Sequence, residues 1–282
     1  MPSERFPPSD TDGATRAFYA RSLRELNDSR VPYLVGGAYA LGHYTRIDRF
    51  TKDFDIFIRR ADYERVMQVF AALGCTTELT HPHWLGKARS ESAFVDVIFS
   101  SGNGVAAVDD EWFEHATDGE ALGVPVRFCP AEEMIWSKSF VMERERYDGA
   151  DVMHLLLACG PQIDWPRLLR RFGPYWRVLL SHLILFGFIY PSDRRRIPEE
   201  VLRDLLGRLQ REMRRPPPSE RVCWGTILSR AQYLIDIEYW GYGDARLTPP
   251  AVMTDEEVAR WTAAIESGGE RKQRPMEDDT RH

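Results

Sequence analysis

The stretch Thr51-Lys52-Asp53-Phe54-Asp55-Ile56-Phe57-Ile58 places two acidic residues one position apart in an otherwise apolar run. The apolar residues Phe54, Ile56 and Ile58 alternate with the acids, and this pattern predicts a strand over residues 53–58. Because strand side chains alternate between faces, Asp53 and Asp55 project from the same face, with Cα atoms roughly 6–7 Å apart. Both carboxylates can therefore reach the same one or two divalent cations.

A glycine pair lies upstream of these acids, in Tyr33-Leu34-Val35-Gly36-Gly37. The apolar residues predict a buried strand over residues 32–35, followed by a helix over residues 38–44. Without a Cβ in the way, the backbone amides of Gly36 and Gly37 can approach a polyphosphate closely. A glycine pair alone is most often only a turn. Gly37 and Gly42 have the spacing of a Walker phosphate-binding loop, but no Lys-Ser/Thr follows, so we reject that motif. Together with the two aspartates, the pair indicates metal-assisted chemistry on a nucleoside triphosphate.

A third acid, Asp96, interrupts the apolar run Phe94-Val95-Asp96-Val97-Ile98-Phe99. An unpaired charge inside a buried strand is costly, so this position calls for an explanation. If the strand lies beside the first one, Asp96 adds a third carboxylate to Asp53 and Asp55. Three converging carboxylates repel one another unless a cation is present, which favours a site for two Mg²⁺ ions, with Mn²⁺ as the alternative. If Asp96 lay on the far side of the sheet, or were buried against a basic residue, the proposed reaction would lack the acid that drives it.

The composition limits the classes of protein to consider. The chain has 282 residues, 43% hydrophobic and 28% charged, with a net charge of −6, so no general basic field indicates a nucleic-acid partner. Its four cysteines are scattered without a C-x-x-C pair, which argues against a zinc site or a disulfide framework and fits a reducing cytoplasm: Cys75, Cys129, Cys159 and Cys223. The apolar run at residues 178–190 is too short to span a bilayer. We therefore expect a buried helix there, a cytoplasmic location and no membrane partner.

The order of the predicted elements indicates an α+β fold, in which a small mixed β-sheet with flanking helices is followed by a helical domain. We expect a flexible tail over residues 1–13, a catalytic domain over 14–130, a helical domain over 131–266 and a second tail over 267–282. Pro125 predicts an edge strand over residues 122–129, because proline cannot donate to a sheet ladder. Helical spacing predicts further helices at residues 14–27, 61–73, 109–116, 131–143, 148–158, 165–188 with a break at Pro174, 198–214 and 226–239.

The arrangement resembles the nucleotidyltransferase superfamily that includes DNA polymerase β, in its minimal bacterial form. That family carries a glycine pair after a strand, Asp-x-Asp on the next strand and a third Asp on a later one; the matching residues here are Gly36, Gly37, Asp53, Asp55 and Asp96. The stretch Arg49-Phe50-Thr51-Lys52-Asp53-Phe54-Asp55 is also similar to the R-x-T-x-D-x-D motif of bacterial members. These include aminoglycoside nucleotidyltransferases and toxins of toxin–antitoxin pairs.

Two further segments are similar to the same family. Residues 123–133 before Lys138 resemble its strand leading into a helix that bears a lysine, and residues 144–151 resemble its R-x-x-x-D-x-x-D segment. The resemblance implies that Lys138 touches the triphosphate while Asp148 and Asp151 support the site. Tyr147 departs from the pattern, because many relatives carry Lys before the first Asp. The structural alternatives are that Lys138 is a solvated helix lysine, and that Asp148 and Asp151 cap a helix or pair with Arg144 and Arg146.

The resemblance implies an NTP-dependent enzyme in which an acceptor hydroxyl attacks the α-phosphate and pyrophosphate leaves. Asp53 and Asp55 would bind both metal ions, and Asp96 would bind one and assist deprotonation. The phosphates would be held by Gly36, Gly37, Thr51 and Lys138. The acceptor stays open among a small molecule, for which a cationic aminoglycoside suits the acidic chain, an RNA and a protein; an antitoxin is a further partner to consider. The alternative is a catalytically inactive protein that keeps the fold and binds ATP or another nucleotide.

Overall fold

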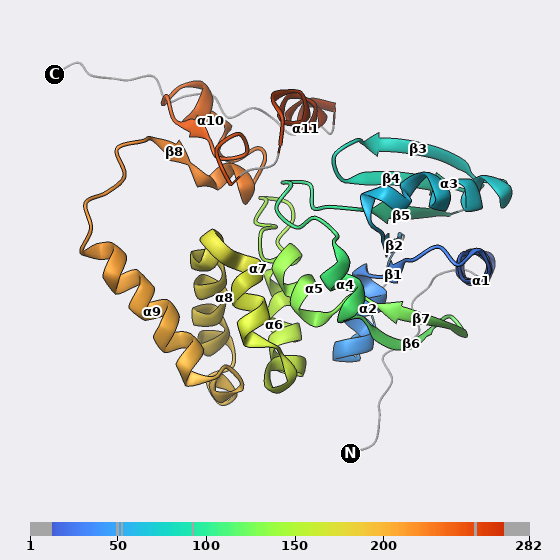
Figure 1. Cartoon of the computed structure of the whole chain (residues 1–282), viewed down its shortest axis with the longest axis horizontal. Coiled ribbons are helices and arrows are strands. Elements are labelled where there is room, and N and C mark those ends of the chain that lie inside the picture. Colours follow the sequence, from blue (N-terminus) through green and yellow to red (C-terminus); the bar gives the residue numbers. More distant parts are fainter. Residues whose placement is uncertain (1–12, 49–50, 52, 92, 251–252, 268–282) are drawn as a thin grey trace.

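The computed structural model describes residues 13–48, 51, 53–91, 93–250 and 253–267, with side chains up to residue 263. The predicted tails fall almost entirely outside these residues, as do Arg49, Phe50 and Lys52 of the predicted R-x-T-x-D-x-D motif. Within the described residues, a seven-stranded mixed sheet is followed by a run of helices (Figure 1). The predicted α+β class is therefore confirmed.

The sheet has the strand order β3-β4-β5-β2-β1-β7-β6. Parallel pairs join β2 with β5 and β1 with β7, and the other neighbours are antiparallel. The strands have these bounds: β1 Leu34–Val35, β2 Phe54–Phe57, β3 Thr76–His81, β4 Leu85–Arg89, β5 Phe94–Ile98, β6 Thr117–Ala121 and β7 Val124–Phe128.

The two faces of the sheet carry different helices: α1 (Gly13–Ser29) and α3 (Tyr63–Ala72) on one, α2 (Gly37–Thr45) and α4 (Asp110–Glu114) on the other. Phe54 packs its ring on Tyr19 of α1, with ring centroids 5.0 Å apart. Phe57 faces the opposite side and stacks on Trp112 of α4 at 5.2 Å. The period-two alternation of the sequence therefore turns Phe54 to the face covered by α1 and α3, and Asp55 with Phe57 to the opposite face.

The prediction of an edge strand around Pro125 is wrong. This residue lies on β7, which pairs with β1 on one side and β6 on the other, so that β6 forms the edge. Proline is tolerated because β1 is only two residues long and pairs with β7 through Val35 and Phe128 alone. The Pro125 carbonyl accepts a hydrogen bond from Asn27 Nδ2 at 2.9 Å in place of a strand partner.

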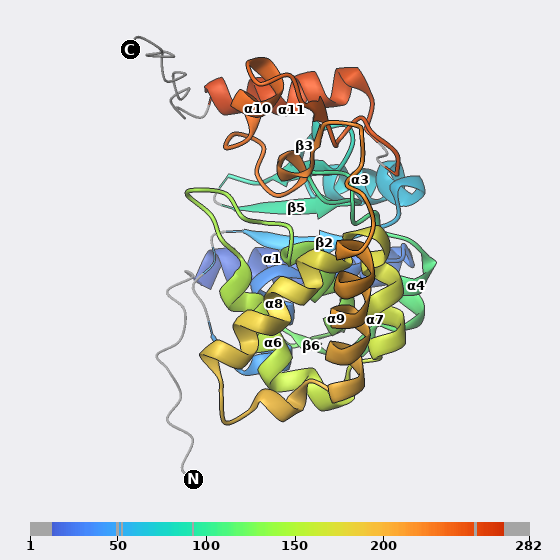
Figure 2. The same cartoon turned by 90° about the vertical axis from the view of Figure 1, so that its left-hand side faces the viewer.

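The helices after the sheet lie together on one side of it (Figure 2). They are α5 (Ala131–Lys138), α6 (Gly149–Cys159), α7 (Trp165–Phe172), α8 (Trp176–Ile189) and α9 (Glu199–Met213). The predicted break at Pro174 is confirmed by the 3₁₀ turn Gly173–Tyr175 between α7 and α8. Of the described residues, one helical stretch, Trp165–Ile189, is long and apolar enough by length and composition to cross a membrane. The expected buried helix is buried on one face only, because Phe188 of α8 is 81% exposed.

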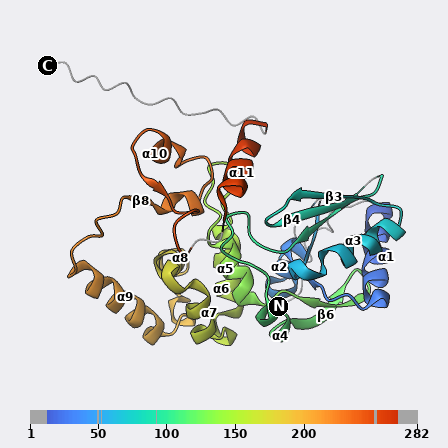
Figure 3. The same cartoon turned by 45° about the horizontal axis from the view of Figure 1, so that its top comes forward.

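The chain then returns toward the sheet through β8 (Val222–Cys223), α10 (Leu234–Glu238), β9 (Gly243–Asp244) and α11 (Asp255–Ser267) (Figure 3). The helix expected over residues 226–239 is wrong as a continuous element, because only the short helices Trp224–Ile227 and α10 form there. Trp261 of α11 packs edge-on against Trp84 beside the β3–β4 hairpin, with ring centroids 5.4 Å apart. The last helix is thus tied to the sheet rather than to α5–α9 alone.

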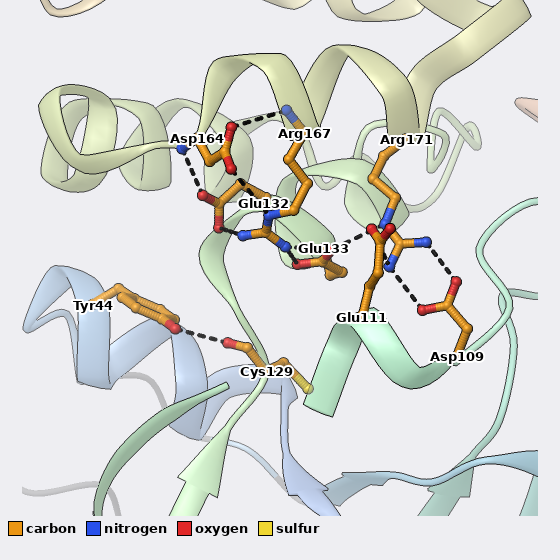
Figure 4. Close-up of polar contacts among 9 residues, drawn as sticks. All are labelled: Tyr44, Asp109, Glu111, Cys129, Glu132, Glu133, Asp164, Arg167 and Arg171. Atoms are coloured by element: carbon orange, nitrogen blue, oxygen red, sulfur yellow. Dashed lines mark hydrogen bonds and ion pairs between the residues drawn. The ribbon is translucent and has the colours of Figure 1, made fainter. Parts of the chain in front are cut away.

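A buried ionic network fixes α5 against α7 and the start of α4 (Figure 4). Arg167 of α7 is 4% exposed at its side chain and binds Glu133 of α5 at 2.7 Å and Glu132 at 2.7 Å. Arg171 joins Glu133 at 3.1 Å to Asp109, at the start of α4, at 2.6 Å. Burial raises the pKa of Glu133, although both arginines oppose it. Each buried charge in this network therefore depends on its partners.

Replacing Arg167 with Met should destabilise the protein strongly, because Glu132 and Glu133 would lose a buried partner. We expect a loss of about 3–5 kcal/mol in the free energy of unfolding, measured by chemical denaturation. The control is Arg203→Met, which removes an exposed i,i+4 pair with Glu199 and should cost less than about 0.5 kcal/mol. Equal losses for the two variants would contradict the assigned role of the network.

Candidate active site

The parallel pairing of β2 with β5 brings the predicted acids together. Asp55 and Asp96 are direct Cα partners in this ladder, so their side chains lie on the same face, on strands about 4.8 Å apart. Asp53 immediately precedes β2 and is two residues from Asp55, which places it on that face as well. The three aspartates that the sequence analysis selected thus form one cluster, named here the carboxylate site.

Gly37 forms the wall of the carboxylate site. It begins α2 with φ +54°, a left-handed conformation that glycine adopts at little cost. A Cβ built on Gly37 would lie 1.8 Å from Asp55 Oδ2, so only a bare Cα leaves room for the carboxylate. Gly36 has a different task, since its N–H donates to the Asp55 carbonyl at 3.0 Å. The first N–H groups of α2 have no intrahelical partner and lie beside the acids, where an anion could bind them.

Thr51 orients Asp53. Its hydroxyl lies 3.1 Å from Asp53 Oδ1 and 2.9 Å from the Asp53 carbonyl oxygen, and donates to these acceptors. Thr51 also lines a cavity of about 340 Å³ that follows one side of α2 toward the β6–β7 turn. Arg16 and Arg46 contribute cationic side chains to this cavity. Thr51 therefore connects the carboxylate site with a hollow large enough for part of a small molecule.

Burial and charge repulsion raise the pKa values of Asp55 and Asp96. Burial raises the pKa of Asp55 to about 7, and Asp96 and Asp53 add to the increase, while Lys138 and Arg146 oppose it. Burial also raises the pKa of Asp96, against the opposing effect of Lys87. No ion pair or hydrogen bond of the Asp55 carboxylate is recorded among the described residues. A cation bound to the carboxylate oxygens of Asp55 would favour the ionised form of this acid.

Lys87 is the main feature that the sequence analysis missed. It lies on β4 as the Cα partner of Asp96, and its Nζ contacts Asp96 Oδ1 at 2.6 Å. Asp96 is thus buried against a basic residue, the arrangement that by the sequence analysis would leave the reaction without its third acid, and Lys87 contacts Oδ1 of its two oxygens. The residue stands in Leu85-Gly86-Lys87-Ala88-Arg89, where alternation marks a strand, but no local signal gives the register that puts it opposite Asp96.

Lys138 lies next to the carboxylate site but is bound by other acids. Its Nζ contacts Asp148 at 3.0 Å and Asp151 at 2.8 Å. Burial alone would lower the pKa of Lys138, but these two carboxylates outweigh it and raise that pKa. Lys138 is thus bound by both acids, and Asp148 also pairs with an arginine as the alternative in the sequence analysis held; a part of these residues in a reaction stays a prediction. Arg146 binds Asp148 at 3.1 Å with a side chain that is 69% exposed.

The donor set fits a divalent cation at two of the three acids. Asp53 and Asp55 supply hard carboxylate oxygens from adjacent positions of one face, which Mg²⁺ and Mn²⁺ accept. Asp96 already has Lys87 on one oxygen. Among the described residues, no group of three or more His, Cys, Asp or Glu side chains is arranged to hold a metal ion as the side chains stand. The fit is therefore to Asp53 and Asp55, with Asp96 engaged by a cation of the chain itself.

No protein-family model and no curated protein sequence matches the chain. Solved structures show a distant likeness. The antibiotic-resistance factor ANT(2'')-Ia is 17% identical at a TM-score of 0.44, covering 61% of this chain and 98% of its own. The lincosamide antibiotic adenylyltransferase LnuA is 15% identical at 0.36, covering 50% and 94%. A nucleotidyltransferase-like protein from Paracoccidioides brasiliensis is 13% identical at 0.35, covering 63% and 94%. At these TM-scores the likeness decides nothing about activity, which is argued from the residues alone.

The raised pKa of Asp55 predicts how stability depends on pH. Between the ordinary pKa of 3.8 and about 7, the folded protein keeps a proton that the unfolded chain has released, so stability falls as pH rises through this window. Asp55→Asn should remove this penalty. Without metal, we expect the variant to exceed the native protein by about 1–4 kcal/mol at about pH 8, and by much less near pH 5, in chemical denaturation.

The matched control for this prediction is Asp118→Asn, a change at a side chain that is 93% exposed. It should leave the pH dependence of unfolding unchanged. Added Mg²⁺ should stabilise the native protein at about pH 8, because the ion provides a positive partner for the ionised Asp55 carboxylate. It should leave Asp55→Asn unaffected. Parallel pH profiles for the native protein and Asp55→Asn would contradict the assignment.

Gly37→Ala tests the wall of the site. The new Cβ would meet the Asp55 carboxylate, whereas Gly123→Ala at φ +76° has nothing within 4 Å. Gly123→Ala should therefore cost only the left-handed strain of about 1–2 kcal/mol. We expect Gly37→Ala to cost more and also to weaken Mn²⁺ binding, measured by thermal melting and electron paramagnetic resonance. The same loss of stability and intact Mn²⁺ binding in both variants would show that Gly37 does not shape the site.

Proposed function

We propose that the chain is a metal-dependent nucleotidyltransferase that moves a nucleoside monophosphate from an NTP to an acceptor hydroxyl. One observation supports it above all: Asp55 and Asp96 are register partners on parallel strands, with Asp53 on the same face and Gly37 against Asp55. Such a set of acids beside a bare helix N-terminus suits a cation and a polyphosphate together. The proposed cofactor is Mg²⁺, with Mn²⁺ as a substitute.

In the proposed reaction the acceptor oxygen attacks the α-phosphorus while the bond from that phosphorus to the pyrophosphate oxygen breaks. When bound, the metal lowers the pKa of the hydroxyl and stabilises charge on the pyrophosphate. Asp53 and Asp55 hold it, and Thr51 fixes the orientation of Asp53. The proton of the acceptor hydroxyl passes to Asp96 Oδ2, because Oδ1 is held by Lys87.

Contacts to the phosphates come from the N-terminus of α2 and from the cationic side chains around it. Gly37 opens α2 beside Asp55, and the first free N–H groups of that helix offer donors for phosphate oxygens. Arg146 is mostly exposed and near enough to Asp55 to oppose its protonation, so it can reach a phosphate bound there. Lys138 acts behind it: by binding Asp148 and Asp151 it sets the segment that carries Arg146.

A second function, nucleotide binding without catalysis, is favoured by one observation. Lys87 forms an ion pair with Asp96, the acid proposed to take the proton. In that case the chain would still bind a nucleotide through α2 but would transfer nothing. The two functions differ in one measurable respect, the formation of a labelled product.

The test is label transfer from an NTP labelled at the α-phosphate, with Mg²⁺ or Mn²⁺ and with acceptor fractions of small molecules, RNA and protein from a cell extract. The native protein should label one fraction and release pyrophosphate. Asp53→Asn and Asp55→Asn should each reduce the rate by at least about a hundredfold, since even outer partners of a metal site contribute 10- to 100-fold.

Asp118→Asn, on the exposed edge strand β6, is the control and should keep the full rate. Nucleotide binding without label in any fraction would favour the non-catalytic function. Label transfer that survives both Asp53→Asn and Asp55→Asn would contradict the proposed site. The fraction that carries the label would also identify the class of acceptor, and a labelled protein would direct the search for a partner such as an antitoxin.

A further inference from the structure

Lys87, Asp96 and Asp55 form a row across three adjacent strands. Lys87 of β4 is the Cα partner of Asp96 of β5, which is in turn the Cα partner of Asp55 of β2. All three side chains therefore point to the same face of the sheet. Gly86, next to Lys87, faces the opposite side, where a Cβ would meet Tyr63 and Met67 of α3. The position of Lys87 beside the acids is fixed by two ladders and not by a mobile loop.

The surroundings of Lys87 hold its ammonium group in place. The side chain is 18% exposed, and Nζ lies 4.6 Å from the centre of the Phe94 ring as well as 2.6 Å from Asp96 Oδ1. The pair is thus partly shielded from water. In such surroundings a charge-assisted bond of this length is stronger than at an open surface. Displacing the lysine would leave Asp96, which is 9% exposed, without its partner.

Two other cations that the structure describes near the acids bind other residues. Lys138 binds Asp148 and Asp151, and Arg146 binds Asp148. Among the described residues, Lys87 is the cationic side chain recorded in direct contact with Asp53, Asp55 or Asp96. One positive charge of the protein is therefore built into the carboxylate site, where it binds one of the three acids.

We propose that Lys87 is a resident cation of the carboxylate site, standing where a second metal ion would otherwise bind. This inference rests on the proposed function, and it revises the two-ion site of the sequence analysis to a site for one divalent ion. Asp53 and Asp55 bind that ion, while Lys87 holds Asp96 Oδ1 and leaves Oδ2 toward the acceptor. Lys87 is thus a positioning residue: it acts through Asp96 and does not touch the substrate.

The inference is tested by counting bound Mn²⁺ ions in the full chain without nucleotide, by electron paramagnetic resonance titration. The native protein should bind one ion at the carboxylate site. Lys87→Met keeps the aliphatic length but removes the charge, so Asp96 becomes free and the variant should bind two ions. Lys87→Arg keeps the charge and should bind one ion, which shows that charge and not side-chain shape sets the number.

Two controls accompany the titration. Arg89→Gln removes a charge two residues along β4, where the side chain is 48% exposed and paired with Glu78, and should bind one ion. The double variant Lys87→Met with Asp96→Asn should return to one ion, because the freed carboxylate is gone. Thermal melting of each variant establishes that it is folded before its ions are counted, and Lys87→Arg provides a second reading should Lys87→Met unfold.

The outcomes separate this inference from the proposed function. One ion in the native protein and two in Lys87→Met support it. Two ions in the native protein, or one in both, overturn the role of Lys87 while label transfer can still be observed. If Lys87→Met is unfolded, two ions in Lys87→Arg overturn the role of charge, and one ion supports it. No bound Mn²⁺ in any variant overturns the metal site itself, and with it both proposals.

Discussion

The candidate site depends on the parallel pairing of β2 with β5. This pairing sets Asp55 opposite Asp96, although 41 positions separate them in the chain. A slip of one residue would turn Asp96 to the face covered by α1 and α3, because side chains alternate with period two. The register is held by the apolar partners on that other face, such as Phe54 with Val95 and Ile56 with Val97, which are almost fully buried. Hydrophobic packing on one side of the sheet thus positions charge on the other.

Charge balance is the second constraint on this region. Of the cations that the structure describes near these acids, Lys87 binds Asp96, and Lys138 binds Asp148 and Asp151. Asp55 differs from Asp96, because no cation of the described residues is recorded in contact with it. Its pKa is raised, and its carboxylate lies against the Cα of Gly37. A carboxylate that is partly withdrawn from water, with no ion pair recorded among the described residues, is costly, and such groups cluster at functional sites. Asp55 is therefore the residue at which the structure indicates function most directly.

Local patterns in the sequence predict the parts of the site that lie within one element. Alternation around Asp53 and Asp55 gives their common face, and Gly36-Gly37 gives the turn from β1 into α2. Features that depend on pairing between elements are not predictable in this way. Lys87 stands in an ordinary strand, and only the β4–β5 register makes it a partner of Asp96. Pro125 shows the same limit, because its strand is internal only through the pairing of β7 with β1 at Val35 and Phe128.

The contact of Trp261 with the β3–β4 hairpin has a consequence for how the protein is made. The hairpin carries Lys87, and Trp84 beside it packs against an aromatic ring more than 170 positions later in the chain. Translation proceeds from the N-terminus, so the sheet can assemble while α11 is still inside the ribosome. The hairpin then stays without the Trp261 contact until the residues of α11 have left the ribosome. A nascent chain would therefore carry Asp53, Asp55 and Asp96 on a folded sheet before Trp261 packs on the hairpin that bears Lys87.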